Sequence, residues 1–160
     1  MRAILDLCRD APLAYFEHGD VLLAEGQKTG RLYVLAKGEI EVFRGGARVT
    51  VLSEPGSIVG EMSVLLGVPH TATVRARGDV RAHVISDANA FLAVHPDLAW
   101  LLARLLAKRV NAATTYLADM KRQFAASGDH WSMVGEVLES LIHQQGEDFQ
   151  SGSDRDPGGL

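Results

Sequence analysis

The most constraining feature of this sequence is the stretch PGSIVGEMSVLLGVPHTATV, residues 55–74. The pair Gly60-Glu61 opens a short helix, Gly67 and Pro69 end it, and the alternating residues that follow return as a strand. A helix start carries backbone N–H groups without intrahelical partners, and its dipole favours negative charge. The stretch therefore predicts a pocket for a small phosphate-bearing molecule, in which the Glu61 carboxylate accepts hydrogen bonds from hydroxyl groups.

The surrounding chain consists of short β-prone runs broken by turn residues at regular intervals, as in all-β barrels and rolls. Gly38 and the pair Gly45-Gly46 tolerate positive φ and suit hairpin turns. We predict a mostly β fold with flanking α: an eight-stranded antiparallel β-roll or jelly roll, followed by a long C-terminal helix. The predicted strands span residues 15–18, 21–24, 31–36, 39–44, 48–53, 58–59, 71–77 and 81–85.

After the last strand, Asp87 is placed to cap a short helix that ends at His95-Pro96. A second helix can run from 97 to about 126 without an internal Gly or Pro. Its first half carries an apolar stripe that we expect to pack on the roll: Leu98, Leu101, Leu102 and Leu105.

A second apolar series follows the same helix in alternating steps of three and four: Ala103, Leu106, Val110, Ala113, Leu117, Met120 and Phe124. Such spacing is typical of a coiled-coil seam, and it predicts a homodimer in which two helices pair across a two-fold axis. The alternative is that this series packs against the protein's own roll or its last helix.

Composition indicates one globular domain, since 47% of the 160 residues are hydrophobic and the formal net charge is -4. We place this domain at 1–126, with the roll at about 14–86 and helices at about 87–126. A terminal amphipathic helix is expected at 129–145. Residues 146–160 are polar and glycine-rich and are expected to be disordered.

Charge and cysteine content exclude several classes of protein. The mild acidity disfavours a nucleic-acid surface, and Cys8, the only cysteine, cannot form an intrachain disulfide or a four-cysteine metal site. No signal peptide is expected, and no apolar run reaches the roughly 18 residues of a membrane span. We therefore expect a cytoplasmic protein without a membrane contact, a metal or a cofactor.

Several motifs together resemble the cyclic nucleotide-binding domain family, of the catabolite activator protein type. The segments VGEMSVL at 59–65 and His70-Thr71-Ala72 resemble its phosphate-binding cassette. The resemblance covers about residues 14 to 120 and includes the motifs GDVL at 19–22, EG at 25–26, LYVL at 32–35, GEIEV at 38–42 and PG at 55–56.

The resemblance implies roles for individual residues. Glu61 would accept the ribose 2′-hydroxyl, and Thr71 would offer its hydroxyl and N–H to phosphate oxygens. Thr114 is a candidate contact to the base, although a helical threonine as readily bonds to its own turn. The backbone amides implied in ligand binding are those of Gly60, Met62 and Ala72.

The sequence departs from the family pattern at His70, where the cassette carries arginine. Arginine stays cationic and offers a planar fork of donors, whereas histidine is mostly neutral near pH 7. Three interpretations stay open. His70 becomes protonated and serves as a weaker anion partner, the pocket takes a different ligand, or ligand binding has been lost.

The leading hypothesis is a regulatory sensor that binds cAMP or cGMP and signals through its long helix. The alternative is a degenerate domain that acts as a ligand-free dimeric module for an unknown protein partner. An enzyme is not expected, because no pair of catalytic carboxylates and no nucleophile motif is present. Direct DNA binding is also not expected, because too few residues follow the long helix for a winged-helix domain.

Overall fold

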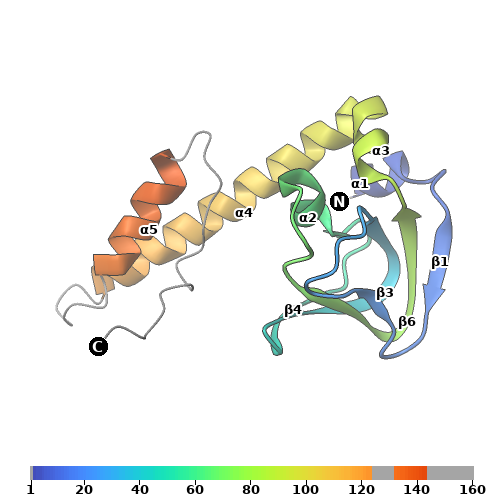
Figure 1. Cartoon of the computed structure of the whole chain (residues 1–160), viewed down its shortest axis with the longest axis horizontal. Helices are drawn as coiled ribbons and strands as arrows, with labels where there is room; N and C mark the ends of the chain where they lie inside the picture. Colours follow the sequence, from blue (N-terminus) through green and yellow to red (C-terminus); the bar gives the residue numbers. More distant parts are fainter. Residues whose placement is uncertain (1, 124–131, 144–160) are drawn as a thin grey trace. The chain divides into compact units, whose positions relative to one another are not determined.

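The computed structural model describes residues 2–123 and 132–143 (Figure 1). They belong to two units that divide between Arg104 and Leu105. The first unit contains α1 (Arg2–Leu7), β1 (Leu13–Phe16), β2 (Val21–Leu23), β3 (Leu32–Arg44), β4 (Ala47–Leu52), β5 (Ile58–Val59), α2 (Glu61–Leu66), β6 (Thr73–Ile85) and α3 (Ala88–Val94). Helix α4 (Pro96–Gln123) begins in the first unit and continues into the second, which also contains α5 (Ser132–His143).

All six described strands join one antiparallel sheet, in which the order β1-β6-β3-β4 forms the main path. Strand β2 pairs with β6, and the two-residue β5 pairs with β3. The long strands β3 and β6 pair with each other along most of their length, from Leu32↔Ile85 to Phe43↔Thr73. This arrangement confirms the predicted antiparallel β-roll with flanking helices and a long helix.

The prediction of eight strands was wrong, because β3 and β6 each absorb two predicted strands. Gly38 was expected in a hairpin turn, but it lies inside β3 with a φ of 98°, where the β3–β6 register shifts. Gly78 likewise lies inside β6 with a φ of 75°. A glycine at positive φ can form a bulge as well as a turn, so the chain bends here without reversing. Gly45-Gly46 does form the predicted turn, between β3 and β4.

The core of the roll is built from the inward faces of β2, β3, β5 and β6. Leu35, Ile40 and Val80 are each about 1% exposed, and Phe16 contacts Tyr33 edge to face at 5.8 Å between ring centroids. Burial of these side chains stabilises the roll by roughly 1.5–3 kcal/mol each. The sheet is therefore anchored by its two long strands.

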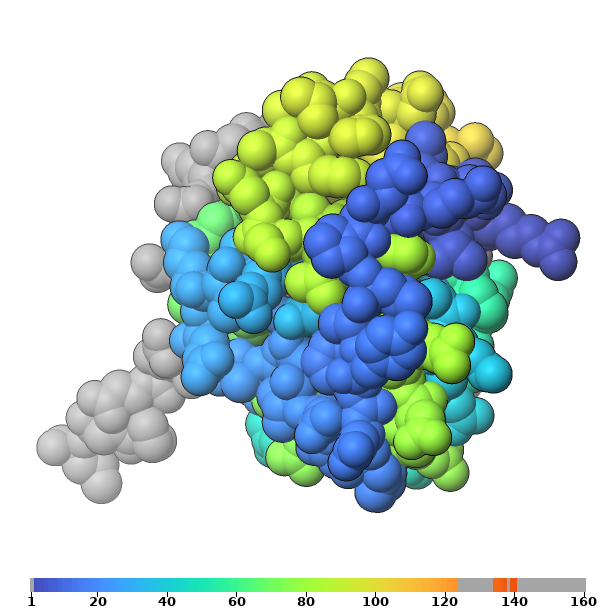
Figure 2. All heavy atoms as spheres, turned by 90° about the vertical axis from the view of Figure 1, so that its right-hand side faces the viewer, coloured from blue at the N-terminus to red at the C-terminus, as the bar shows by residue number. Residues whose placement is uncertain are grey.

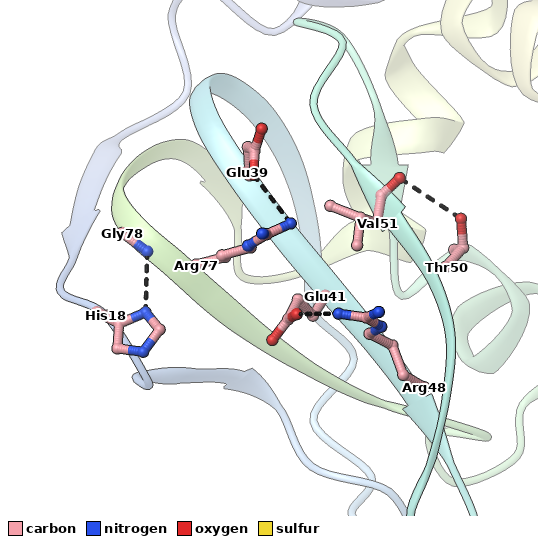
Figure 3. Close-up of polar contacts among 8 residues, drawn as sticks. All are labelled: His18, Glu39, Glu41, Arg48, Thr50, Val51, Arg77 and Gly78. Atoms are coloured by element: carbon pink, nitrogen blue, oxygen red, sulfur yellow. Dashed lines mark hydrogen bonds and ion pairs between the residues drawn. The ribbon is translucent and has the colours of Figure 1, made fainter.

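The outward face of the long strands is polar (Figure 3). Arg77 pairs with Glu39 at 3.5 Å and Arg48 with Glu41 at 3.1 Å, each between neighbouring strands. Such exposed ion pairs contribute at most about 1 kcal/mol each. Glu39 and Glu41 therefore form ion pairs on the outward face of the sheet.

Helix α4 divides its apolar residues between the two units. Leu98 and Leu102 are fully buried in the first unit, and these two residues belong to the stripe predicted to pack on the roll. In the second unit Val110 is 50% exposed and Tyr116 is 64% exposed. Phe124, the last residue of the predicted seam, lies outside the described residues, as does the predicted tail 146–160.

No single helix among the described residues is long and apolar enough to cross a membrane. Only α3 and α4 taken together meet that length and composition, and they are bent by 109° at His95.

Replacing Gly38 by alanine is expected to destabilise the roll far more than the same change at Gly78. A Cβ at Gly38 would clash with the Asp79 carbonyl oxygen, whereas one at Gly78 meets nothing within 4 Å. Both changes place alanine at positive φ, so we expect Gly78→Ala to cost about 1 kcal/mol and Gly38→Ala about 3 kcal/mol or more. Urea unfolding of both variants measures the difference, and equal losses would contradict the proposed close approach.

Candidate ligand-binding site

The cassette predicted from the sequence contains the short helix α2, of about one and a half turns, between β5 and β6. Gly60 precedes α2 with a φ of 93°, and a Cβ there would lie 2.5 Å from the Arg31 carbonyl oxygen. Gly67 ends the helix with its N–H donating to the Ser63 carbonyl, and the Ser63 hydroxyl donates to the Val68 carbonyl at 2.6 Å. Glycine is therefore required at the start of the helix by both conformation and space.

Glu61 is the first residue of α2 and is only 5% exposed. A carboxylate in the first turn interacts favourably with the helix dipole, and a buried one needs hydrogen-bond donors around it. Met62, the next residue, is 43% exposed. The helix start thus combines a buried carboxylate with an accessible neighbour.

His70 is 3% exposed and is held by the loop of residues 24–31. Its N–H donates to the Gln27 carbonyl and its carbonyl accepts from the Gly26 N–H, each at 2.8 Å. Ring atom Nε2 lies 2.7 Å from the Thr29 hydroxyl oxygen. Burial lowers the pKa of the imidazole below its usual 6.5, which favours the neutral form of His70 at neutral pH.

The same loop contacts both halves of the cassette. It meets the helix start through the Arg31 carbonyl at Gly60, and it meets the returning segment through Gln27 and Thr29 at His70. Lys28 Nζ also donates to the Gly67 carbonyl at the end of α2. The loop therefore joins two segments that are separated along the chain.

Thr71 and Ala72 follow His70, are half-buried, and lead into β6. The structure thus places Gly60, Glu61, Met62, His70, Thr71 and Ala72 around one helix and its return, in the first unit. Thr114 belongs to the second unit, where its hydroxyl donates to the carbonyls of Val110 at 2.8 Å and Asn111 at 3.0 Å. This bond to its own helical turn is the alternative to a base contact that the sequence analysis left open for Thr114.

Thr29 is the site residue that sequence reasoning missed. It lies 41 positions before His70, and nothing in their spacing links the two residues. Gly26 and Gly30 flank Thr29, and both have positive φ. These glycines were the feature of the sequence that could have indicated a turn in this loop.

A separate surface groove of about 430 Å³ lies at the end of β1 and away from the cassette residues. Figure 2 shows this face, where the blue atoms of β1 lie beside the green atoms of β6. Its charged lining is balanced between Lys37 and Arg81 on one side and Glu17 and Asp79 on the other. Neither the groove nor its charges belong to the cassette, and no group of three or more His, Cys, Asp or Glu side chains among the described residues can hold a metal ion.

The family model described as cyclic nucleotide-binding domain matches residues 13–94. The chain belongs to the cyclic nucleotide-binding domain family. The match contains the whole cassette and the loop of residues 24–31 that contacts it.

Curated relatives and solved structures agree with this membership. The chain is 29% identical over 125 residues to a CRP-like cAMP-activated global transcriptional regulator of Mycobacterium tuberculosis, and the match covers 74% of the chain and 55% of the regulator. It is 38% identical over 68 residues to an uncharacterized ABC transporter ATP-binding protein of the same organism, covering 40% of the chain and 21% of that protein. The chain therefore spans about half the length, or less, of these curated relatives.

Two structures of bacterial proteins share the fold. The Thermus thermophilus catabolite activator protein superposes with a TM-score of 0.61 at 23% identity, covering 89% of this chain and 84% of that one. The N-terminal domain of a Streptomyces coelicolor transcriptional regulator superposes with a TM-score of 0.51 at 28% identity, covering 68% of this chain and 81% of that one. The first likeness shows the fold alone.

Acidification is expected to destabilise the chain through His70. Because burial lowers its pKa in the folded state, the unfolded chain binds the proton more readily, and stability is lost as pH falls below 6.5. Urea unfolding between about pH 7.5 and 5.5 should show a steeper fall for the wild type than for His70→Gln. The same slope in both proteins would contradict a neutral, buried His70.

Proposed function

We propose that this chain is a regulatory module that binds a cyclic nucleotide, cAMP or cGMP, in the cassette and signals through α4. The observation that carries the proposal is the helix start at Gly60-Glu61, where a buried carboxylate stands beside backbone that only glycine allows, inside a domain of the cyclic nucleotide-binding family. This arrangement suits a ligand that carries both hydroxyls and an anion.

Each part of the nucleotide has a proposed partner. Glu61 accepts the ribose 2′-hydroxyl, and Thr71 donates its hydroxyl to a phosphate oxygen. The backbone amides of Gly60, Met62 and Ala72 also face the cyclic phosphate, and Thr114 contacts the base once α4 closes over the ligand. Signalling requires the ligand to bind this closed state better than the open one, because only differential affinity shifts a conformational equilibrium.

Glu61→Ala is expected to weaken cyclic nucleotide binding by roughly 10–100-fold, the effect of losing a hydrogen bond to a charged group. Thr71→Ala is expected to weaken it about fivefold, as for one neutral hydrogen bond. Isothermal titration calorimetry with cAMP and with cGMP measures both effects and identifies the preferred nucleotide.

Two exposed residues of the same types provide controls. Glu54 lies in the β4–β5 connection and Thr50 lies in β4, both outside the cassette. The variants Glu54→Ala and Thr50→Ala should bind the nucleotide as tightly as the wild type. The proposal fails if the folded wild type gives neither heat nor a thermal shift at millimolar nucleotide. That result would favour the ligand-free interaction module, which the neutral, buried His70 also supports.

The second unit is proposed to form a homodimer through α4. Val110 is half exposed, and Leu106, Leu117 and Met120 are partly exposed along the same predicted seam. Introducing glutamate at Val110 and Leu117 should convert the dimer to a monomer, because buried unpaired charge is costly in a helix seam. Light scattering coupled to size-exclusion chromatography measures the mass.

Ala112→Glu is the matched control, because Ala112 is exposed on α4 and outside the seam. It should leave the mass of the particle unchanged. A wild-type chain that elutes as a monomer at every concentration would contradict the proposed pairing.

A further inference from the structure

One ring atom of His70 has no hydrogen-bond partner among the residues that the structure describes. Nδ1 is buried and makes no hydrogen bond with any described residue, in a side chain that is only 3% exposed. Leaving a buried polar atom unpaired costs about 1–3 kcal/mol, and native structures rarely do so without a reason. The unpaired atom belongs to the residue that stands where the cassette pattern carries arginine.

The other ring nitrogen already has a partner that accommodates a change of charge. Nε2 lies 2.7 Å from the Thr29 hydroxyl oxygen, and that oxygen also accepts the Arg31 N–H at 3.3 Å. A hydroxyl can donate to a neutral ring nitrogen or accept from a protonated one. In an imidazolium, Nε2–H donates to Thr29, and Nδ1–H becomes a second donor that needs an acceptor.

We propose that binding of a cyclic nucleotide is coupled to the uptake of one proton by His70, whose Nδ1–H then donates to a phosphate oxygen. This inference rests on the proposed function and adds to it the means by which the cassette becomes cationic. Because Nδ1 is buried, the His70 ring or the loop that carries Thr29 shifts when the ligand enters. The proton taken up on binding gives His70 the positive charge that an arginine would carry permanently.

The charged groups on the surrounding elements determine when the proton binds. They are Glu25, Lys28 and Arg31 on the loop, Glu61 on α2, and Asp87, which precedes α3. The start of α3 contacts the same loop, because the Ala88 N–H donates to the Gly30 carbonyl. The Glu25 carboxylate accepts from the Gly45 N–H, the Asp87 carboxylate accepts from the Ala90 N–H, and the Lys28 ammonium donates to the Gly67 carbonyl. A ligand phosphate adds the negative charge that offsets the cost of burying a protonated ring.

The sign of the pH dependence follows from linkage. The pKa of His70 lies below 6.5 in the free chain, and a phosphate contact raises it in the complex. Affinity is therefore highest at low pH and falls as pH rises from the free pKa to the bound one, by up to about tenfold per pH unit. The cyclic phosphate itself stays singly anionic over this range and does not contribute.

The test is calorimetric titration of the wild-type chain with cAMP and with cGMP between about pH 6 and 8.5. Buffers of different ionisation enthalpy report the number of protons taken up, and we expect close to one at a pH between the two pKa values. His70→Arg should bind more tightly than the wild type at the highest pH, without proton uptake. His70→Gln should bind weakly at every pH, also without proton uptake.

His18→Gln is the matched histidine control, because His18 is exposed and its Nδ1 accepts the Gly78 N–H, away from the cassette (Figure 3). It should keep the pH dependence of the wild type. If His70→Arg does not fold, the wild type still provides the test, because ¹³C NMR of the His70 ring should report a raised pKa on nucleotide addition.

The outcomes separate the inference from the proposed function. Nucleotide binding with one affinity across this pH range and no proton uptake would overturn the coupling and leave the sensor intact. Absence of binding at every pH would overturn both. Proton uptake that persists in His70→Gln would assign the proton to another group and would also overturn the inference.

Discussion

The candidate site depends on the close fit between one loop and the cassette. Residues 24–31 touch the start of α2 at Gly60, the returning segment at His70, and the end of α2 through Lys28. Two of these contacts are made by backbone alone on both sides, so they do not depend on side-chain rotamers. A backbone carbonyl 2.5 Å from where a Cβ would stand leaves room for glycine only, so the geometry of the helix start is determined by packing against Arg31.

The electrostatics of the site follow from the same fit. Glu61 and His70 are both nearly excluded from water, so each must be satisfied by neighbouring groups or change its charge. His70 responds by remaining neutral, and its only side-chain bond among the described residues is to Thr29. An arginine could not respond in this way, because its guanidinium stays protonated. His70 therefore does not give the cassette the permanent positive charge that an arginine at this position would give.

The roll presents this site on an otherwise ordinary scaffold. The β3–β6 pair provides the longest run of paired backbone, and its two internal glycines let both strands bend at neighbouring points. A Cβ at Gly38 would clash with the Asp79 carbonyl oxygen, so the bend in β3 packs closely against the bend in β6. Much of the buried core belongs to these two strands and to the short strands paired with them, and the cassette helix sits between β5 and β6.

Local sequence alone determined the kinds of element, the cassette and the residues within it. Alternating apolar residues predicted strands, Gly45-Gly46 predicted a hairpin, and Gly60-Glu61 predicted a helix start, because each of these depends on neighbours along the chain. Only the tertiary structure decided whether Gly38 turns or bulges, which loop closes on His70, and whether its imidazole is neutral. Those outcomes depend on groups 40 or so positions away, such as Asp79 and Thr29, whose approach is determined by strand register and burial rather than by local sequence.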